Sequence, residues 1–522
     1  MIEVEGAASV ADVARVQARR RGSAPALLFE GRSTTFAEVD AMASRVANAL
    51  VASGVRTQDR IAYLSKNDDH FLPFLLGACK ARATLAPFNF RLAAPEIARL
   101  IEDSGARIFV VGPDVVDLAD QAVASLAAKP RRIALGFDRE GYERRDAWIE
   151  NAALDDPRLD ADLQDDVIQL YTSGTTGLPK GVRLTNSNYL AAFELSATPG
   201  WLNYQPGETV LAAMPFFHVA GINVALLALA SGARSAILRD AAPQLILDTI
   251  GRERVHHAFL APALIQMLMH APGIGSADLS SMKKLSYGAS PISEDLLARA
   301  SARFRCEFIQ VYGMTETCGA VTLLTHAAHD PAKGKLRSCG AAMPGVELKI
   351  VSADGAEVPR RAVGEVLIRS PLVTKGYWNK PETTAATICE GWIHTGDAAY
   401  MDEDGYVFIY DRVKDMIVTG GENVYPAEVE NALFGHPAIA DAAVIGVPDD
   451  DWGEAVKAIV VLKSGAPRDA ADIIAWVRAR IAHFKAPKSV DFVDSIPRNI
   501  TGKILRRELR EPYWKGRDRR VN

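Results

Sequence analysis

The stretch Tyr171-Thr172-Ser173-Gly174-Thr175-Thr176-Gly177-Leu178-Pro179-Lys180-Gly181-Val182 is the part of the chain from which its fold and function are interpreted. It follows an apolar run at residues 167–170 that predicts a β-strand. Its glycines let the backbone turn N–H groups inward, its hydroxyl side chains add donors, and its lysine adds a mobile cation. These groups suit a polyphosphate, so the stretch predicts a nucleotide-binding loop.

This loop differs from a Walker P-loop. The Walker motif places Gly-Lys-Ser/Thr at the start of a helix, whereas here Pro179 precedes Lys180 and Gly181 follows it. A short run of glycine, serine and threonine can also be an ordinary flexible turn. The lysine behind a rigid proline, together with motifs farther along the chain, favours the nucleotide interpretation.

The composition is typical of a large globular protein whose ligands are small molecules. The chain has 522 residues, of which 48% are apolar and 24% charged, and this length predicts at least two domains. With 59 basic and 64 acidic residues the net charge is −5, which argues against nucleic acid as a partner.

The cysteines and the apolar runs predict a cytoplasmic location. Five cysteines, an odd number without a CxxC pair, indicate neither a disulfide framework nor a zinc site. We find no signal-peptide pattern and no apolar run of about 18 residues, so we expect no transmembrane segment. The longest apolar candidate, residues 219–230, is interrupted by Gly221 and Asn223 and predicts a buried helix.

Helical and strand-like patterns alternate along most of the chain. Before the phosphate loop, helices are expected after Thr34 and at residues 71–80 and 95–102, and extended segments at residues 60–64, 84–87 and 107–111. Such alternation predicts α/β layers with a largely parallel sheet.

The pattern changes after residue 416. A helix at residues 426–434, strands at 442–447 and 456–462, and a helix at 471–481 predict a compact α+β unit of about a hundred residues. We therefore expect the fold class to be α/β, with a large multi-layer N-terminal domain and a small mobile C-terminal domain.

Two stretches are candidates for the lining of a small-molecule binding site. Ala212-Ala213-Met214-Pro215-Phe216-Phe217-His218-Val219-Ala220-Gly221 places two aromatic residues and a histidine beside small residues. A lone histidine there is usually a core or helix-capping residue, and the functional alternative is a channel lined by His218, with Gly221 leaving space. Residues 285–291 end a strand in a small-residue turn that would let a flat ring approach, although a structural turn is equally compatible.

Two later stretches contribute carboxylates. Gln310-Val311-Tyr312-Gly313-Met314-Thr315-Glu316-Thr317 ends a strand, and beside a triphosphate Glu316 could hold Mg²⁺ while Thr315 touches a phosphate. Gly391-Trp392-Ile393-His394-Thr395-Gly396-Asp397 offers Asp397 as an acceptor for ribose hydroxyls, or simply as a turn cap. Near the end of the chain, Lys503 stands on a glycine turn before two arginines, which by itself suggests only a solvated cationic tail.

These motifs occur in the order found in the adenylate-forming superfamily, and the chain resembles an acyl-CoA synthetase of that group over nearly its whole length. The resemblance rests on residues 172–181, 312–316, 395–397, 411–415 and 501–503. It implies two steps. A carboxylate attacks the α-phosphorus of MgATP to give an acyl-adenylate and pyrophosphate, and the thiol of coenzyme A then attacks the acyl carbonyl. The implied cofactors are ATP, Mg²⁺ and coenzyme A.

The resemblance assigns a role to each matching position. The leaving phosphates would be held by Thr172, Ser173, Gly174, Thr175, Thr176, Gly177 and Lys180, and Mg²⁺ by Glu316 and Thr172. The adenine and α-phosphate would be contacted by Gly288, Ala289, Ser290, Tyr312, Gly313 and Thr315. Asp397 and Arg412 would bind the ribose, and Lys503 would bridge the carboxylate and the α-phosphate as a compact point charge.

The resemblance also implies that the domains rotate between the two steps. The N-terminal domain would span residues 1–411 and the C-terminal domain residues 416–522, with Lys414 as the pivot of a hinge at residues 412–415. In the second arrangement Gly421 would face the pantetheine tunnel and Trp452 would stack on the coenzyme.

The acid is predicted to be apolar. The expected pocket residues are Phe217, His218, Gly221, Tyr287, Val311 and Met314, and they offer no cation for a second carboxylate. We expect a medium- or long-chain fatty acid, with an aryl or alicyclic acid as the near alternative and an inactive nucleotide-binding regulator as the alternative of a different class. Two positions depart from the family pattern: Asn186 replaces a common histidine, and Tyr287 replaces a frequent glycine and could reshape the pocket.

For the oligomeric state, the sequence leaves a homodimer open.

Overall fold

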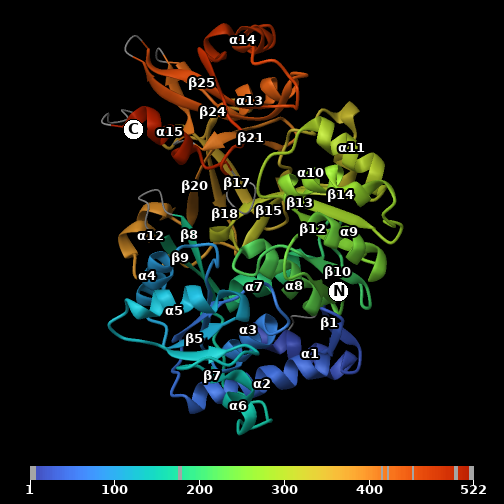
Figure 1. The fold of residues 1–522 in the computed structure, drawn as a ribbon, viewed down its shortest axis with the longest axis vertical. Helices are drawn as coiled ribbons and strands as arrows, with labels where there is room; N and C mark the ends of the chain where they lie inside the picture. Colours follow the sequence, from blue (N-terminus) through green and yellow to red (C-terminus); the bar gives the residue numbers. More distant parts are fainter. Residues whose placement is uncertain are drawn as a thin grey trace.

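The computed structural model of this protein describes residues 7–173, 179–412, 415–419, 422–449, 452–498 and 504–515. The chain forms two large sheets, a smaller antiparallel sheet and a separate C-terminal sheet, with helices between and around them (Figure 1). This agrees with the predicted α/β class, a large N-terminal domain and a smaller C-terminal one.

The first large sheet has seven strands and carries the predicted phosphate loop at one edge. Its spatial order is β7 (Glu143–Arg144), β6 (Arg131–Ala134), β5 (Ile108–Val111), β3 (Arg60–Leu64), β4 (Thr84–Pro87), β8 (Asp166–Ser173) and β9 (Pro179–Thr185). All neighbours are parallel except β8 and β9, which form an antiparallel hairpin.

The second large sheet has nine strands and is parallel in its centre. Its order is β16 (Ala341–Ala342), β15 (Gly319–Leu324), β14 (Glu307–Met314), β13 (Lys284–Gly288), β12 (His257–Leu260), β10 (Thr209–Ala212), β11 (Arg234–Ile237), β1 (Pro25–Phe29) and β2 (Arg32–Thr35). The six strands from β14 to β1 run parallel, and the strands at both edges are antiparallel.

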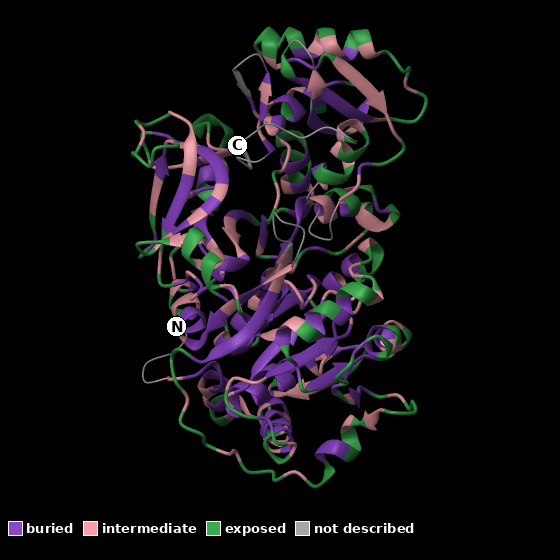
Figure 2. Ribbon diagram, turned by 90° about the vertical axis from the view of Figure 1, so that its left-hand side faces the viewer, coloured by how far each residue is buried: buried purple, intermediate pink, exposed green. Residues whose placement is uncertain are grey.

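Helices form layers on the faces of these two sheets. The shared layer comprises α1 (Val10–Arg21), α2 (Phe36–Ala52), α3 (Phe71–Lys80), α7 (Asn186–Leu195) and α8 (Val219–Ser231), whose apolar residues join both sheets in one core. The outer layer on the seven-stranded sheet comprises α4 (Ala94–Ser104) and α5 (Val116–Ala124). The outer layer on the nine-stranded sheet comprises α9 (Pro243–Arg252), α10 (Pro262–His270) and α11 (Glu294–Phe304). The short helix α6 (Arg145–Glu150) follows β7. Exposed residues gather on the outer helices and loops, while most strands of the two large sheets are buried (Figure 2).

A smaller sheet lies between this body and the C-terminal domain. Its strands are β17 (Glu347–Val351), β18 (Gly364–Arg369), β20 (Trp392–Met401) and β19 (Ile388–Cys389), with β21 (Val407–Arg412) paired to β20 and α12 (Pro381–Thr387) beside it.

The C-terminal domain is built on its own sheet, at one end of the molecule (Figure 1). Its strands are β23 (Glu422–Val424), β22 (Ile417–Thr419), β25 (Gly453–Leu462), β24 (Ile439–Asp449) and β26 (Ser489–Phe492). Two helices, α13 (Pro426–Phe434) and α14 (Ala470–Arg478), contribute to the core on one face, and α15 (Arg506–Trp514) contributes to the other. Among the described residues, we find no helix both long and apolar enough to cross a membrane.

Candidate active site

Four of the predicted motifs follow the carboxyl ends of strands, which is where parallel α/β sheets bind ligands. The phosphate loop follows β8, the segment with Phe217 and His218 follows β10, Ala289 follows β13, and Thr315 follows β14. The two sheets therefore direct motifs that are far apart in the sequence toward one side of the N-terminal domain.

The phosphate motif is a β-hairpin. Thr172 lies opposite Lys180 and Ser173 opposite Pro179 in the antiparallel register of β8 and β9. The segment after the loop is a strand, so the absence of a Walker motif, in which a helix follows, agrees with the structure. The remaining loop residues of the prediction lie outside the described residues: Gly174, Thr175, Thr176 and Gly177.

Glu316 lies in a one-turn helix, Thr315–Thr317, directly after β14. Its side chain is buried, and one carboxylate oxygen, Oε1, accepts a hydrogen bond from the hydroxyl of Tyr377 at 3.0 Å. The ring of Tyr377 lies 5.1 Å from the Nζ atom of Lys180. Tyr377 thus stands between the predicted metal-binding carboxylate and the predicted phosphate-binding cation.

The carboxylate of Glu316 would suit Mg²⁺. It is a hard oxygen ligand, and Mg²⁺ usually takes one or two protein oxygens and completes its shell with phosphates and water. No cluster of three or more histidine, cysteine or acidic residues that could hold a metal ion occurs within the described ranges. A cation at Glu316 would therefore depend on a bound triphosphate for its other ligands.

The predicted ribose site joins two sheets. The hydroxyl of Tyr312, at the end of β14, donates to Oδ2 of Asp397 on β20 at 2.6 Å, and Asp397 is 5% exposed. Arg412 lies opposite Asp397 in the pairing of β20 with β21, while its side chain lies outside the described part of the structure. This arrangement brings Tyr312 and Asp397 together.

The predicted adenine turn has two close backbone approaches. A Cβ atom on Gly288 would lie 2.4 Å from the carbonyl oxygen of Val311, and one on Gly313 would lie 1.8 Å from that of Gly319. Ala289 adopts a left-handed conformation with φ of 68° and is exposed, and Ser290 is half-buried. The turn therefore presents backbone, with little side-chain obstruction, beside the end of β14.

His218 caps helix α8. Its Nδ1 atom accepts a hydrogen bond from the backbone N–H of Ala220 at 3.3 Å, and burial of the ring lowers the pKa of His218 to about 4. The ring is therefore neutral at pH 7. Beside it, Phe217 packs edge-to-face on Phe90 with ring centroids 5.4 Å apart. Of the two interpretations of His218, the capping role is the one that the geometry shows directly.

Two of the predicted pocket residues have other positions than expected. A Cβ atom on Gly221 would lie 2.3 Å from the carbonyl oxygen of Pro215 and 2.5 Å from that of Met214, so the missing side chain makes room for backbone and not for an acid. Tyr287 is fully buried in the core beneath α9–α11, and its hydroxyl lies 2.9 Å from Nε2 of His329.

The position of Tyr287 corrects the expected pocket. Val311 belongs to the core on the other face of the nine-stranded sheet, and Met314 packs against that same core. Because successive residues of a strand point to opposite faces, Tyr287 points away from the side on which Val311 lies. The structure brings Val311 and Met314 to one face of the nine-stranded sheet and leaves Tyr287 on the other.

The unusual Asn186 has a structural role. Its Oδ1 atom accepts from the backbone N–H of Val10 at 3.0 Å, and its Nδ2 atom donates to the carbonyl oxygen of Asp162 at 2.9 Å. It therefore joins the start of α7 to α1 and to the segment before β8.

In the C-terminal domain, only Trp452 of the predicted functional residues can be described. It is 52% exposed, and the Nζ atom of Lys488 lies 5.5 Å from its ring. An exposed indole beside a cation would suit a nucleotide of the coenzyme. Lys503, Lys414 and Gly421 lie outside the described residues.

Tyr377 is a candidate that the sequence reasoning missed. It lies in the run Gly376-Tyr377-Trp378, an aromatic pair after a glycine in the connection from β18 to α12. Such a run is as typical of a packed loop as of a site, and only the folded contacts distinguish the two.

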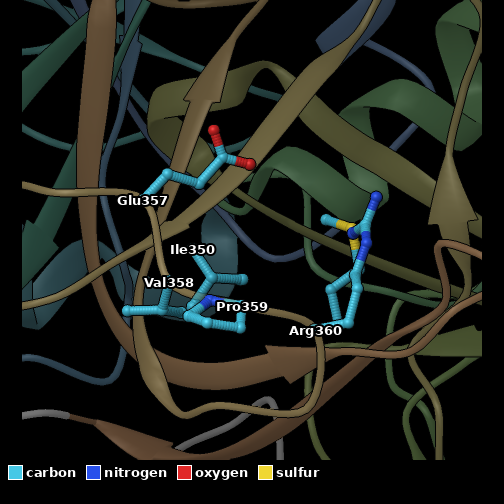
Figure 3. A pocket seen from close by; sticks show the side chains of 6 residues that line it. Ile350, Glu357, Val358, Pro359 and Arg360 are labelled. Atoms are coloured by element: carbon cyan, nitrogen blue, oxygen red, sulfur yellow. The ribbon is translucent and has the colours of Figure 1, made fainter.

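A separate surface cavity of about 420 Å³ lies on the smaller sheet (Figure 3). Its walls are formed by Ile350, Glu357, Val358, Pro359, Arg360 and Met401. None of the predicted site residues lines it, so it is distinct from the site described above.

Comparison with known proteins gives matches over both domains. The family profile described as AMP-binding enzyme matches residues 14–378, and that of the AMP-binding enzyme C-terminal domain matches residues 428–503. The chain is 41% identical to a fatty acid–[acyl-carrier-protein] ligase of Streptomyces coeruleorubidus over 509 residues, 97% of this chain and 96% of that protein.

Two further matches come from different acid classes. A feruloyl-CoA synthase of an Amycolatopsis species is 38% identical over 95% of this chain and 97% of that one. The structure of a fatty acyl CoA synthetase of Mycobacterium tuberculosis superposes with a TM-score of 0.77 at 32% identity, covering 98% of this chain and 99% of that one.

Proposed function

Since this chain belongs to the AMP-binding enzyme family, we propose that it activates an apolar carboxylic acid with MgATP and transfers the acyl group to the thiol of coenzyme A. The proposed acid is a medium- or long-chain fatty acid. The observation that supports the first step best is the contact of Tyr377 with Glu316 at 3.0 Å, with the Lys180 ammonium 5.1 Å from the same ring. It combines a metal-binding carboxylate and a phosphate-binding cation in one assembly.

The chemistry of the first step requires two anions to approach each other. The acid and the triphosphate repel, and preorganised cations and hydrogen-bond donors remove that barrier and align the attacking oxygen with the α-phosphorus. In our proposal Lys180 and the hairpin bind the leaving pyrophosphate, Tyr312 and Asp397 position the nucleoside, and Glu316 holds Mg²⁺. When bound, Mg²⁺ would neutralise phosphate charge.

The apolar character of the acid side is supported by the chemistry of its proposed lining. Val311 lies in an apolar core against which Met314 packs, Phe217 packs on Phe90, and burial keeps His218 neutral at pH 7. A second acid class, aryl acids, is supported by the 38% identity to a feruloyl-CoA synthase. A carrier-protein thiol as acceptor is supported by the 41% identity to an acyl-carrier-protein ligase.

One assay tests the identity of the carboxylic acid and of the thiol that accepts the acyl group. Pyrophosphate release is measured over saturated acids of increasing length and over hydroxylated cinnamic and benzoic acids, first without a thiol and then with coenzyme A or a phosphopantetheinylated carrier protein. We expect turnover with fatty acids to increase on adding coenzyme A. Preference for cinnamic acids would replace the proposed acid, and stimulation by the carrier protein alone would replace the proposed acceptor.

The proposed division into residues 1–411, a hinge at residues 412–415 and residues 416–522 is tested through Lys503. Lys503→Ala should abolish acyl-adenylate formation but spare thioester formation from a supplied acyl-adenylate, because only the first step uses its charge. Lys515→Ala, at an exposed lysine just after α15, is the matched control and should retain both half-reactions. Equal loss of both half-reactions in Lys503→Ala would contradict the alternation of domains.

We also propose a cytoplasmic location. All five cysteines are free thiols, as in proteins of a reducing compartment. The homodimer stays an untested prediction.

A further inference from the structure

The segment 374–378 runs beside β9, the strand that carries Lys180. The backbone N–H of Arg183 donates to the carbonyl oxygen of Gly376 at 3.1 Å, and that of Trp378 donates to the carbonyl oxygen of Gly181 at 2.8 Å. These two bonds attach the segment to the outer edge of the phosphate hairpin as a short additional strand.

The same segment also holds the turn that carries Glu316. The backbone N–H of Thr374 donates to the carbonyl oxygen of Glu316 at 2.8 Å, and the hydroxyl of Tyr377 donates to its Oε1 atom at 3.0 Å. Glu316 is therefore fixed at its backbone and its side chain by residues three positions apart in one loop. Tyr377 is 7% exposed, so its ring is held in place by packing.

A buried ion cluster anchors this segment. The carboxylate of Asp166, fully buried at the start of β8, contacts the cationic groups of Arg60, Arg183 and Lys375, each at 2.8 Å. The guanidinium of Arg60 lies 3.3 Å from the ring centroid of Trp378.

The indole N–H of Trp378 donates to the carbonyl oxygen of Asp103 at 2.9 Å. Residues on both sides of Tyr377 are thus tied to the body of the domain: Lys375, two positions before it, through Asp166, and Trp378, directly after it, through Asp103. The backbone that presents Tyr377 is fixed on both sides.

We propose that Tyr377 is a positioning residue for adenylation, which orients the Glu316 carboxylate through its hydroxyl and the Lys180 ammonium through its ring. This inference rests on the proposed function, because it needs a magnesium-bound triphosphate at Glu316. Tyr377 acts through two residues that would touch the nucleotide and is not itself assigned a contact with it. When a residue that hydrogen-bonds to a metal ligand is replaced, the affinity for the metal typically falls by about 10–100-fold.

The test separates the hydroxyl from the ring. Tyr377→Phe removes the bond to Glu316 and keeps the ring beside Lys180, whereas Tyr377→Leu removes both contacts. ATP binding is measured by calorimetry without any acid, as a function of Mg²⁺ concentration. We expect the Mg²⁺ concentration for half-maximal binding to rise about tenfold in Tyr377→Phe, with a further loss of ATP affinity in Tyr377→Leu and an unchanged KM for the acid in Tyr377→Phe.

Tyr189→Phe is the matched control. Tyr189 is buried even more deeply than Tyr377, and its hydroxyl has no hydrogen-bond partner among the described residues. This variant should bind ATP with the wild-type dependence on Mg²⁺. Equal changes in Tyr189→Phe and Tyr377→Phe would show a general effect of removing a buried hydroxyl, and would overturn the proposal.

A double-mutant cycle with Glu316→Gln decides whether Tyr377 acts through Glu316. If it does, adding Tyr377→Phe to Glu316→Gln has no further effect on ATP affinity. Additive losses would overturn the proposal, as would wild-type Mg²⁺ dependence in Tyr377→Phe. If the wild-type protein itself binds ATP without needing Mg²⁺, the proposed function fails at its metal site, which is a different result from the failure of Tyr377 alone.

Discussion

Gly221→Ala should destabilise the protein although alanine is the better helix former. In α8 a Cβ atom at this position would lie 2.3 Å from the carbonyl oxygen of Pro215 and 2.5 Å from that of Met214. Both are backbone atoms, which cannot escape by a change of rotamer. Helix and loop must therefore separate, and overpacking of this kind costs about 1–3 kcal/mol. The gain in helix propensity offsets at most about 1 kcal/mol, so a net loss of up to about 3 kcal/mol is expected.

Gly251→Ala is the matched control and should have the opposite sign. Gly251 lies near the end of α9, and a Cβ atom there would meet its nearest neighbour, the carbonyl oxygen of Asp278, at an ordinary contact distance of 3.5 Å. Without a steric clash, Gly251→Ala changes only the helix propensity, which stabilises the protein by up to about 1 kcal/mol.

The two variants are compared by thermal unfolding followed by circular dichroism. Because a chain of two domains does not unfold in one step, the midpoint of the N-terminal transition is used and not a global free energy. We expect the midpoint to fall in Gly221→Ala and to stay level or rise in Gly251→Ala. If Gly221→Ala raises the midpoint like its control, the space beside Gly221 is open and our account of this glycine is wrong.

Two further predictions concern the nucleotide and the pH dependence. Tyr312→Phe removes the 2.6 Å bond that fixes the Asp397 carboxylate, so under the proposed function ATP affinity measured by calorimetry should fall, while the lost bond to a charged group lowers folding stability by about 1.5–3 kcal/mol. Tyr142→Phe, which removes a similar bond to Asp120 at 2.9 Å far from the site, should leave ATP affinity unchanged, and equal losses of affinity would contradict this role. The pKa of His218 is lowered from 6.5 to about 4 in the folded protein. Between these two pH values the unfolded chain binds a proton at His218 and the folded chain does not, so the free energy of unfolding decreases as the pH falls from about 6.5 toward 4. His218→Asn keeps a good capping residue and should reduce the drop in thermal midpoint between pH 7 and pH 5, and an unchanged drop would show that His218 does not contribute to it.

Most elements of the fold could be predicted from local patterns. The strand at residues 60–64 and the helices at residues 71–80 and 426–434 have the predicted bounds, since each is a short apolar segment with a clear start and end. The motifs of the candidate site are recognisable in the sequence, because phosphate chemistry requires glycines, hydroxyls and cations in a short span, and the roles assigned to them stay predictions. What they contact could not be predicted, since those contacts join distant segments.

Tyr287 illustrates what the sequence leaves open. Its strand is Lys284-Leu285-Ser286-Tyr287-Gly288, and both faces of this parallel sheet are covered by helices. Alternation between polar and apolar residues is weak in such strands, so no local pattern tells which face a residue occupies. Gly221 was misread for a related reason, since a glycine in a helix can make room for a ligand or for the protein's own backbone. Tyr377 was missed because its partners lie 61 positions away at Glu316 and far upstream at Lys180.

The ion cluster around Asp166 restricts how this protein can change during evolution. Removing the carboxylate of Asp166 leaves its three cations, the buried Arg60 among them, without their shared counter-charge, a loss of about 3–5 kcal/mol, whereas replacing the whole set with apolar residues of similar volume can be neutral. The positions of Arg60, Asp166, Arg183 and Lys375 should therefore vary together among descendants, with few viable intermediates between one complete set and another. The pairing of β8 with β9, built on such a base, keeps its shape even while other parts of the domain diversify.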